Sequence, residues 1–336
     1  MNRWWIYQKE RFPLAAHGPL IAAFSASAVS YSALLRGGSE ARPAVVSFVV
    51  AFVVSLGSFL LLRIADEFKD AEEDARWRPY RPVPRGLVTL GELRWVGLWV
   101  VCIQCVVTLL ASFVFQPELI RLEVVGGLDG TVATEERLIG YFDFRLFALL
   151  AVTWVYFGLM SKEFFAREWL KARPVVYLFS HMAIMPLVDW FATGCDWVRA
   201  GTGMPTGLFW FLAASFFNGV VIELGRKIRA PEQEEEGVET YSFLWGCPVA
   251  VASWLAAMGA TLGCAWVAAG RIGFFVPVVV ALGVVLAGAV VLGVAFVRTR
   301  SGRLAKGIEA ASGVWTLALY LMLGVVPLLV KIGGAG

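Results

Sequence analysis

The chain has 336 residues, of which 59% are hydrophobic and only 16% are charged, and its net charge is +3. Ordinary soluble domains carry about a quarter charged residues. A soluble globular protein of this size could not bury so much apolar surface, so that class is excluded. We expect the lipid bilayer as the surroundings of this chain and no nucleic-acid partner.

Nine apolar segments recur along the chain, and most approach the length of about 20 residues that a helix needs to cross a bilayer. They cover residues 14–35, 44–64, 95–115, 146–160, 175–191, 207–222, 246–269, 272–296 and 314–330. The first segment is followed by further spans and not by the small-residue cleavage site of a signal peptide. We therefore expect that segment to stay in the membrane. The pattern predicts an all-α integral membrane protein of about nine transmembrane helices, forming one domain over residues 1–336.

The orientation follows from the distribution of Lys and Arg, which are enriched in cytoplasmic loops. Of the 29 such residues, 21 lie before the first segment or after the second, fourth, sixth and eighth segments. We therefore place the N-terminus and the loops at about 63–94, 161–174 and 223–245 in the cytoplasm, and the C-terminus outside. The membrane that we expect is the inner membrane of a bacterium.

A first charged cluster follows the second apolar segment, where Asp66, Asp70 and Asp74 recur every four residues. If the helix continues through them, the three carboxylates lie on one face, each about 6 Å from the next. Their mutual repulsion would be relieved by a divalent cation, and Mg²⁺ prefers carboxylate oxygens that it shares with substrate phosphates. The alternative is a solvated acidic helix end.

A basic loop comes directly after these acids and reads Arg76-Trp-Arg-Pro-Tyr-Arg-Pro-Val-Pro-Arg-Gly86. Its prolines restrict the backbone, and guanidinium groups bind phosphate oxygens well. Acids beside such a loop suit a diphosphate held by Mg²⁺ on one side and by Arg78 and Arg81 on the other. The alternative is a loop that only retains the cytoplasmic orientation.

A second charged cluster follows the sixth segment and repeats this plan. It contains Glu223, Arg226 and Lys227, then an acidic stretch that includes Glu232 and Glu236 before Gly237. Two such loops, four helices apart, suggest two halves around one site. Alternatively, Glu223 and Lys227 form a helical i,i+4 ion pair, and the acidic stretch is solvated.

The first cluster resembles the signature of the UbiA superfamily of membrane prenyltransferases, which is Asn, three residues, Asp, three residues, Asp. Asp70 and Asp74 stand at the two aspartates, and Asp66 stands where the family usually has Asn. The stretch Arg81-Pro-Val-Pro-Arg-Gly86 is similar to the Arg-Pro-Leu-Pro-x-Gly that follows the signature. Nine helices, with one motif after the second and another after the sixth, also match the family.

Two further loops resemble the family less closely. Tyr156 and Lys162 lie near the place where members carry a tyrosine and a basic residue beside the diphosphate. The second family motif has two aspartates four residues apart, whereas this chain has Glu223 followed by Lys227. The resemblance then offers Glu223, and Glu232 of the next acidic pair, as further metal ligands.

The resemblance implies a Mg²⁺-dependent enzyme that transfers a prenyl group from a prenyl diphosphate to an aromatic or lipid-like acceptor within the bilayer. A central apolar chamber would keep water from the allylic cation. The implied catalytic residues are Asp66, Asp70, Asp74, Lys162 and Tyr156, and the implied diphosphate-binding residues are Arg78, Arg81, Lys162, Arg226 and Lys227. The implied metal ligands are Asp66, Asp70, Asp74, Glu223 and Glu232.

Two other functions stay open at this point. An enzyme of the same fold could ionise a prenyl diphosphate without an external acceptor and give a cyclised or hydrolysed terpenoid. A lipid-binding or transport protein could carry degenerate catalytic motifs. His17, near the start of the first segment, is a candidate for the acceptor pocket or for a local hydrogen bond, and we assign no function to His181 or Asp189.

Overall fold

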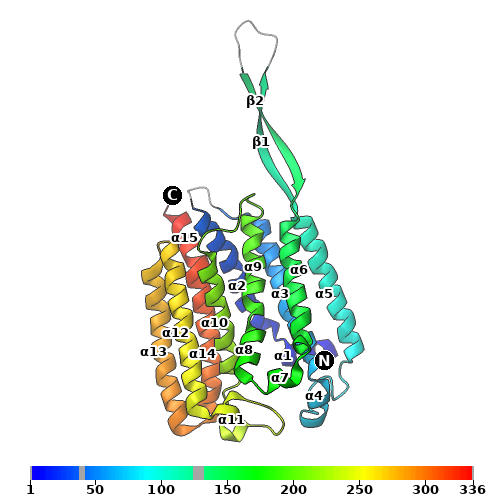
Figure 1. The fold of residues 1–336 in the computed structure, drawn as a ribbon, viewed down its shortest axis with the longest axis vertical. Helices are drawn as coiled ribbons and strands as arrows, with labels where there is room; N and C mark the ends of the chain where they lie inside the picture. The colour runs from blue at the N-terminus through cyan, green and yellow to red at the C-terminus, as the bar shows by residue number, and fades with distance from the viewer. Residues whose placement is uncertain (1, 38–41, 124–131, 335–336) are drawn as a thin grey trace.

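The structure is a computed structural model, and it shows a bundle of long, roughly parallel helices with a β-hairpin projecting from one end (Figure 1). It describes the backbone of residues 2–37, 42–123 and 132–334, and the side chains of these residues outside 114–139. Below, the end that carries the hairpin is called the hairpin end, and the opposite end is called the mouth end.

The long helices of the bundle correspond to the predicted apolar segments. They are α2 (Leu14–Arg36), α3 (Val45–Lys69), α5 (Leu90–Ala111), α6 (Arg145–Ser161), α8 (Pro174–Met182) with α9 (Ile184–Trp197), α10 (Leu208–Arg226), α12 (Cys247–Arg271), α13 (Phe275–Thr299), and α14 (Gly302–Tyr320) with α15 (Val326–Gly333). In the described part of the chain, eight of these spans are long and apolar enough to cross a membrane, and α6 is a shorter apolar helix. The predicted helical membrane fold of about nine spans is confirmed.

Two of the spans are interrupted near a proline. The interruption between α8 and α9 lies at Ala183, and Pro186 explains it, because proline has no N–H to donate to the carbonyl of Met182. Between α14 and α15 the chain forms a π-helical turn, Leu321–Val325, just before Pro327. The first interruption leaves the end of α8 inside the bundle, where it lines the cavity described below.

Four short helices gather at the mouth end (Figure 1). They are α1 (Arg3–Arg11), α4 (Ala71–Trp77), α7 (Arg167–Lys171) and α11 (Tyr241–Trp245), with short 3₁₀ turns at Glu163–Phe165 and Pro231–Gln233. Helix α1 is tied to the bundle by ion pairs from Arg11 to Glu67 and from Arg3 to Glu92. Helices α1, α4 and α7 carry charged residues that the sequence places at the cytoplasmic end, whereas α11 has none.

The hairpin consists of β1 (Phe113–Glu123) and β2 (Val132–Phe142), which pair antiparallel from Phe113 opposite Phe142 to Glu123 opposite Val132. The sequence analysis expected only helices, so this two-stranded element corrects the all-α description. Eleven residues per strand make the hairpin roughly 37 Å long at about 3.4 Å per residue. It points away from the mouth end (Figure 1).

The hairpin end of the bundle is closed by buried polar contacts between helices. Asp196 of α9 accepts hydrogen bonds from Arg36 at 2.7 and 2.9 Å and from Ser32 at 2.7 Å, both of α2. Tyr31 donates to the carbonyl of Ala268 at 2.9 Å. These contacts join α2 to α9 and α12, so the helices are held together at the end remote from the charged loops.

Candidate active site

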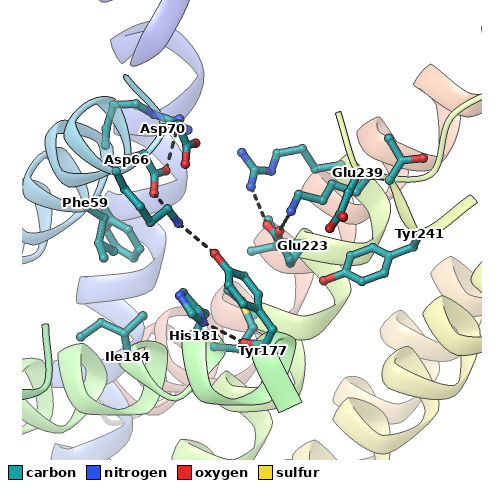
Figure 2. Close-up of a pocket in the computed structure, with 18 of the residues that line it drawn as sticks. Phe59, Asp66, Asp70, Tyr177, His181, Ile184, Glu223, Glu239 and Tyr241 are labelled. Carbon is teal, nitrogen blue, oxygen red and sulfur yellow. Dashed lines mark hydrogen bonds and ion pairs between the residues drawn. The ribbon is translucent and has the colours of Figure 1, made fainter. Parts of the chain in front are cut away.

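A cavity of about 710 Å³ opens at the mouth end and extends into the bundle between α2, α3, α8, α9, α10 and α14. Along α14 it is lined from Glu309 to Tyr320, eleven residues apart, which corresponds to a depth of about 16 Å. Charged side chains gather near its opening, and apolar ones line its interior. Figure 2 shows Asp66 and Asp70 on one side of this cavity and Glu223, Glu239 and Tyr241 on the other.

The first side of the mouth is the last turn of α3, because this helix continues past its apolar segment to Lys69. Asp66 lies 3.4 Å from Arg63 and 3.6 Å from Lys69. Lys69 also donates a hydrogen bond of 2.9 Å to the hydroxyl of Tyr177 on α8. The carboxylate of Asp70 forms no ion pair or side-chain hydrogen bond within the described residues, and it lines the cavity.

The third acid of the series is turned away from Asp66 and Asp70. Helix α3 ends at Lys69, and α4 begins at Ala71, so the face shared by the first two acids does not continue. Asp74 is buried and lies 2.6 Å from both Arg78 and Arg81. The cavity is lined by Arg78 and Arg81 but not by Asp74, so the predicted single row of three carboxylates does not form.

The opposite side of the mouth is the end of α10. Glu223 lies 2.6 Å from Arg226 and 3.0 Å from Lys227, which is the helical ion pair that the spacing allowed as an alternative. Glu239 and Tyr241 follow in the next loop and line the same side. Arg226 and Lys227 line the cavity and neutralise Glu223 in this structure, and their role in diphosphate binding stays a prediction.

The two sides are joined over the mouth by the loop after α10. Gly237 has a φ of +72°, and a Cβ at this position would lie 2.5 Å from the ring of Trp77. The hydroxyl of Tyr80 donates to Glu235 at 2.6 Å, while Glu234 accepts from Thr240 at 2.7 Å. Glycine is required here because the loop backbone lies directly against the indole of Trp77.

Besides Asp74, three predicted residues lie outside the cavity lining. The hydroxyl of Tyr156 donates to the carbonyl of Ser180 at 2.6 Å, and Lys162 is exposed at the end of α6. Glu232 accepts the N–H of Gly302 at 2.9 Å, at the N-terminus of α14. The structure gives each of these side chains a local contact or a solvent position, and none of them faces Asp70.

The structure also brings in Lys69, Tyr177 and His181, which the sequence analysis did not assign to the site, and His17, which it named as a candidate for the acceptor pocket. Lys69 and Tyr177 form the bond described above, and His181 lies one helical turn further along α8. His17 lines the cavity from the start of α2. Tyr177 and His181 are spaced i,i+4, which places them on one helix face. This spacing is the only feature of the sequence that could have pointed to the pair.

The charges that line the cavity suit an anionic ligand together with a divalent cation. The lining includes nine Lys and Arg side chains and seven Asp and Glu side chains. Within the described residues no group of three or more His, Cys, Asp and Glu side chains is arranged to hold a metal ion. Mg²⁺ is usually held by one or two carboxylates together with substrate phosphates, and Asp66 with the unpaired Asp70 fits this smaller ligand set.

The pKa of the Asp70 carboxyl is raised from its ordinary value, mainly because burial disfavours the charged form, and Asp66 and Asp74 raise it further against the opposing effect of Lys69. A bound cation would offset this cost, because opposite charge favours the ionised carboxylate. Asp70 therefore has the electrostatic character of a ligand whose partner is a cation.

The interior of the cavity is apolar and partly aromatic. Phe24 and Phe59 from α2 and α3 pack edge to face at 5.4 Å, and Ile184 and Met185 of α9 also line the cavity. Tyr320 lies at the far end, 5.0 Å from Phe24 between ring centres. The cavity, about 16 Å deep by the helical rise, thus combines a charged mouth with an apolar interior.

Neither family models nor curated proteins give a sequence match to this chain. Solved structures do match its fold. A UbiA homologue from Aeropyrum pernix K1, in its apo form, superposes with a TM-score of 0.62 at 12% identity, over 94% of this chain and 98% of that one. A digeranylgeranylglyceryl phosphate synthase superposes with a TM-score of 0.58 at 10% identity, over 99% of this chain and 100% of that one.

The chain therefore has the UbiA fold over nearly its whole length. The resemblance that the sequence motifs suggested is confirmed at the level of the fold, and the mouth of the cavity coincides with the loops that carry those motifs.

Proposed function

We propose that this protein is a Mg²⁺-dependent prenyltransferase of the UbiA superfamily, which moves a prenyl group from a prenyl diphosphate to an aromatic or lipid-like acceptor inside the membrane. The observation that carries the proposal is the division of one cavity into a charged mouth and an apolar interior. A prenyl diphosphate has the same division, with an anionic head and a hydrocarbon tail. The matching fold supports this reading.

The head of the substrate would lie between the two sides of the mouth. Asp66 and Asp70 would hold Mg²⁺, which on binding supplies charge neutralisation to the leaving diphosphate. Arg78 and Arg81 on one side, and Arg226 and Lys227 on the other, line the cavity and would donate to diphosphate oxygens. Lys69, held in place by Asp66 and Tyr177, would be a further donor.

The tail would lie along the apolar interior. Three main-chain bonds of an extended polypeptide span about 3.5 Å, so the four bonds of an isoprene unit span roughly 5 Å. The whole cavity is about 16 Å deep, so it accommodates a tail of at most about three units. The rings of Phe24 and Phe59 stand beside this path, and aromatic faces stabilise a nearby cation.

Water must be kept from the allylic cation, and the loop over the mouth would serve this purpose. Gly237 against Trp77, and Tyr80 bonded to Glu235, join the two sides across the opening. In the orientation proposed from the basic residues, this mouth faces the cytoplasm of a bacterial cell.

The test measures release of diphosphate from a panel of labelled prenyl diphosphates by the detergent-purified protein, with Mg²⁺ or with EDTA. We expect release with Mg²⁺ only, and a loss of release in Asp70→Asn. Glu72→Gln is the matched control, because Glu72 is exposed, lies two residues away and does not line the cavity. No release at any chain length, with a membrane lipid extract added as acceptor source, would refute the proposal. Cyclised products formed without acceptor would instead identify a terpenoid cyclase.

A further inference from the structure

His181 lies where the apolar interior begins, just below the charged mouth. It is the residue one turn beyond Tyr177 on α8, about 6 Å along the helix, and Tyr177 accepts the hydrogen bond of Lys69. In Figure 2 its ring lies between Tyr177 and the apolar residues Ile184 and Phe59. A prenyl diphosphate with its head at Lys69 and Asp70 would bring its first carbon to this level.

The ring of His181 is held in one orientation. It stacks on Tyr177 at 3.9 Å between ring centres with an angle of 15° between the planes, and Phe164 meets it edge to face at 6.2 Å. Nδ1 lies 2.8 Å from the carbonyl oxygen of Tyr177. A carbonyl oxygen only accepts, so Nδ1 must carry the proton.

This tautomer leaves Nε2 as a bare acceptor. The side chain is 8% exposed, lines the cavity, and its Nε2 is buried without a hydrogen-bond partner in the described part of the chain. A buried acceptor without a partner is costly and rare. An unpaired imidazole nitrogen at the level of the reacting carbon is the arrangement of a general base that meets its partner only when the acceptor binds.

Several other basic groups that line the cavity are engaged. Glu223 is held by Arg226 and Lys227, and Glu163 lies 3.0 Å from Arg167. Asp66 and Asp70 would be occupied by the cation. His17 also lines the cavity, but no hydrogen bond within the described residues fixes its tautomer, and its Nδ1 is itself buried without a partner.

We propose that His181 is the general base of this enzyme and that the acceptor is a neutral hydroxyl compound. This inference rests on the proposed function. The bond from the first prenyl carbon to the diphosphate oxygen breaks, and its electron pair leaves with the diphosphate. A lone pair of the acceptor oxygen forms the new bond to that carbon. The O–H electron pair stays on oxygen, the proton passes to Nε2, and the imidazolium returns it to water after the products leave.

The class of acceptor follows from this step. A carboxylate or a phosphate is already ionised at neutral pH and would not need a base, and near this level it would face the neutral imidazole and the apolar wall. A hydroxyl group, by contrast, satisfies the unpaired Nε2 by donating to it. Removal of this base should cost about 100-fold or more in transfer.

Two measurements test the inference. In the first, the ratio of prenylated product to diphosphate released is measured for wild type, His181→Asn and His17→Asn, with neutral and anionic fractions of a membrane lipid extract as acceptors. Asn at position 181 can still donate to the Tyr177 carbonyl but lacks Nε2. We expect the ratio to fall about 100-fold in His181→Asn, because diphosphate is still released while the allylic cation is captured by water to give the prenyl alcohol. The transfer that remains should be confined to the neutral fraction.

An unchanged ratio in His181→Asn, a fall in His17→Asn alone, or transfer to the anionic fraction alone would overturn the inference while leaving the proposed function intact. No release by wild type would remove both. The second measurement needs no activity. The chain has two histidines, so ¹⁵N-histidine NMR of wild type and His17→Asn assigns the His181 signals. A protonated Nδ1 with a bare Nε2 is expected, and a protonated Nε2 would refute the inference.

Discussion

The hairpin end of the bundle and the lining of the cavity use buried charge in different ways. At the hairpin end, Asp196 is fully engaged by Arg36 and Ser32 of another helix. At the mouth end, Asp70 lacks a partner among the described side chains, and Glu223 is neutralised by cations of its own segment. Charges that join helices hold the fold, whereas charges retained within one segment remain available to a ligand. Substitutions should therefore reduce stability at the first end and activity at the second.

The largest effect on stability is expected from Arg36→Met. It would leave the carboxylate of Asp196, 3% exposed, with Ser32 as its remaining partner. Removing one partner of a buried ion pair costs about 3 kcal/mol or more. This loss of stability is measured by thermal unfolding in detergent, with a thiol-reactive dye that reports when the buried Cys195 becomes accessible. Arg36→Lys keeps the charge and is the control. Equal losses in both variants, or a lower diphosphate release per folded molecule, would contradict the division between the two ends.

The largest effect on activity is expected from Asp70→Asn. We expect a loss of about 100-fold or more in diphosphate release, because charge neutralisation by a metal supplies several kcal/mol and each 1.4 kcal/mol is about tenfold. Glu72→Gln should keep the rate of wild type. If diphosphate release fell equally in both variants, the rate would depend on the charge of α4 as a whole and not on Asp70 as a ligand.

In the absence of metal, Asp70→Asn should increase the stability of the folded protein. Because the pKa of Asp70 is raised by burial and by Asp66, protonation is favoured by folding. The protonated Asp70 therefore stabilises the folded protein below the pKa of the unfolded state, about 3.9. This stabilisation is lost as the pH rises through the pKa of Asp70 in the folded state. In EDTA at pH 7, Asp70→Asn should therefore unfold at a slightly higher temperature than wild type, and the difference should vanish near pH 4. A lower unfolding temperature of the variant in EDTA at pH 7 would show that the carboxylate is already stabilised there.

A smaller effect is expected from Gly237→Ala. A Cβ would meet the Trp77 ring and should push the loop from the mouth, which raises KM for the prenyl diphosphate by about tenfold, equivalent to 1.4 kcal/mol. Gly86→Ala is the matched control, since Gly86 has a φ of +73° with nothing within 4 Å of an added Cβ. Both variants carry the strain of a left-handed residue, about 1 kcal/mol. An equal KM in the two variants would show that the contact with Trp77 does not close the mouth.

Much of the fold could be predicted because apolar length alone determines which segments cross a membrane. The hairpin could not, since the sequence analysis sought only segments long enough to span the bilayer. Of the acids, Asp66 and Asp70 were placed correctly on one helix end. Asp74 was not, because α3 ends at Lys69 without a Pro or Gly to mark the change, and the partners that bury Asp74 are Arg78 and Arg81.

Residues of the site that the sequence did not reveal lie inside apolar segments. Tyr177 and His181 are surrounded by hydrophobic residues in the chain, so their spacing indicates a shared face and no partner. Lys69, which bonds Tyr177, is 108 residues away. Only the packing of α3 against the span formed by α8 and α9 brings the two together. The interruption of that span at Ala183 gives no indication of what lies opposite.

The smallest effect is expected from Glu73→Gln, which breaks the contacts of α4 with α7. Glu73 lies 2.6 Å from Lys171 and 3.1 Å from Arg167, but these side chains are 35 to 43% exposed, so solvent screens the pairs and the loss should stay under about 1 kcal/mol. Burial alone would raise the pKa of Glu73, but Lys171 and Arg167 outweigh it and hold the pKa below its ordinary value.

The stabilisation from Glu73 is therefore present above the unfolded pKa of about 4.3 and is lost as the pH falls through the lower folded value. The difference in unfolding temperature between wild type and Glu73→Gln should be measurable at pH 7 in low salt and should disappear in acid and at about 1 M salt, where screening acts within roughly 3 Å. A difference that persists at high salt would mean that α4 and α7 are joined by a buried contact. The mouth would then share the character of the hairpin end, where Arg36 and Asp196 hold helices together.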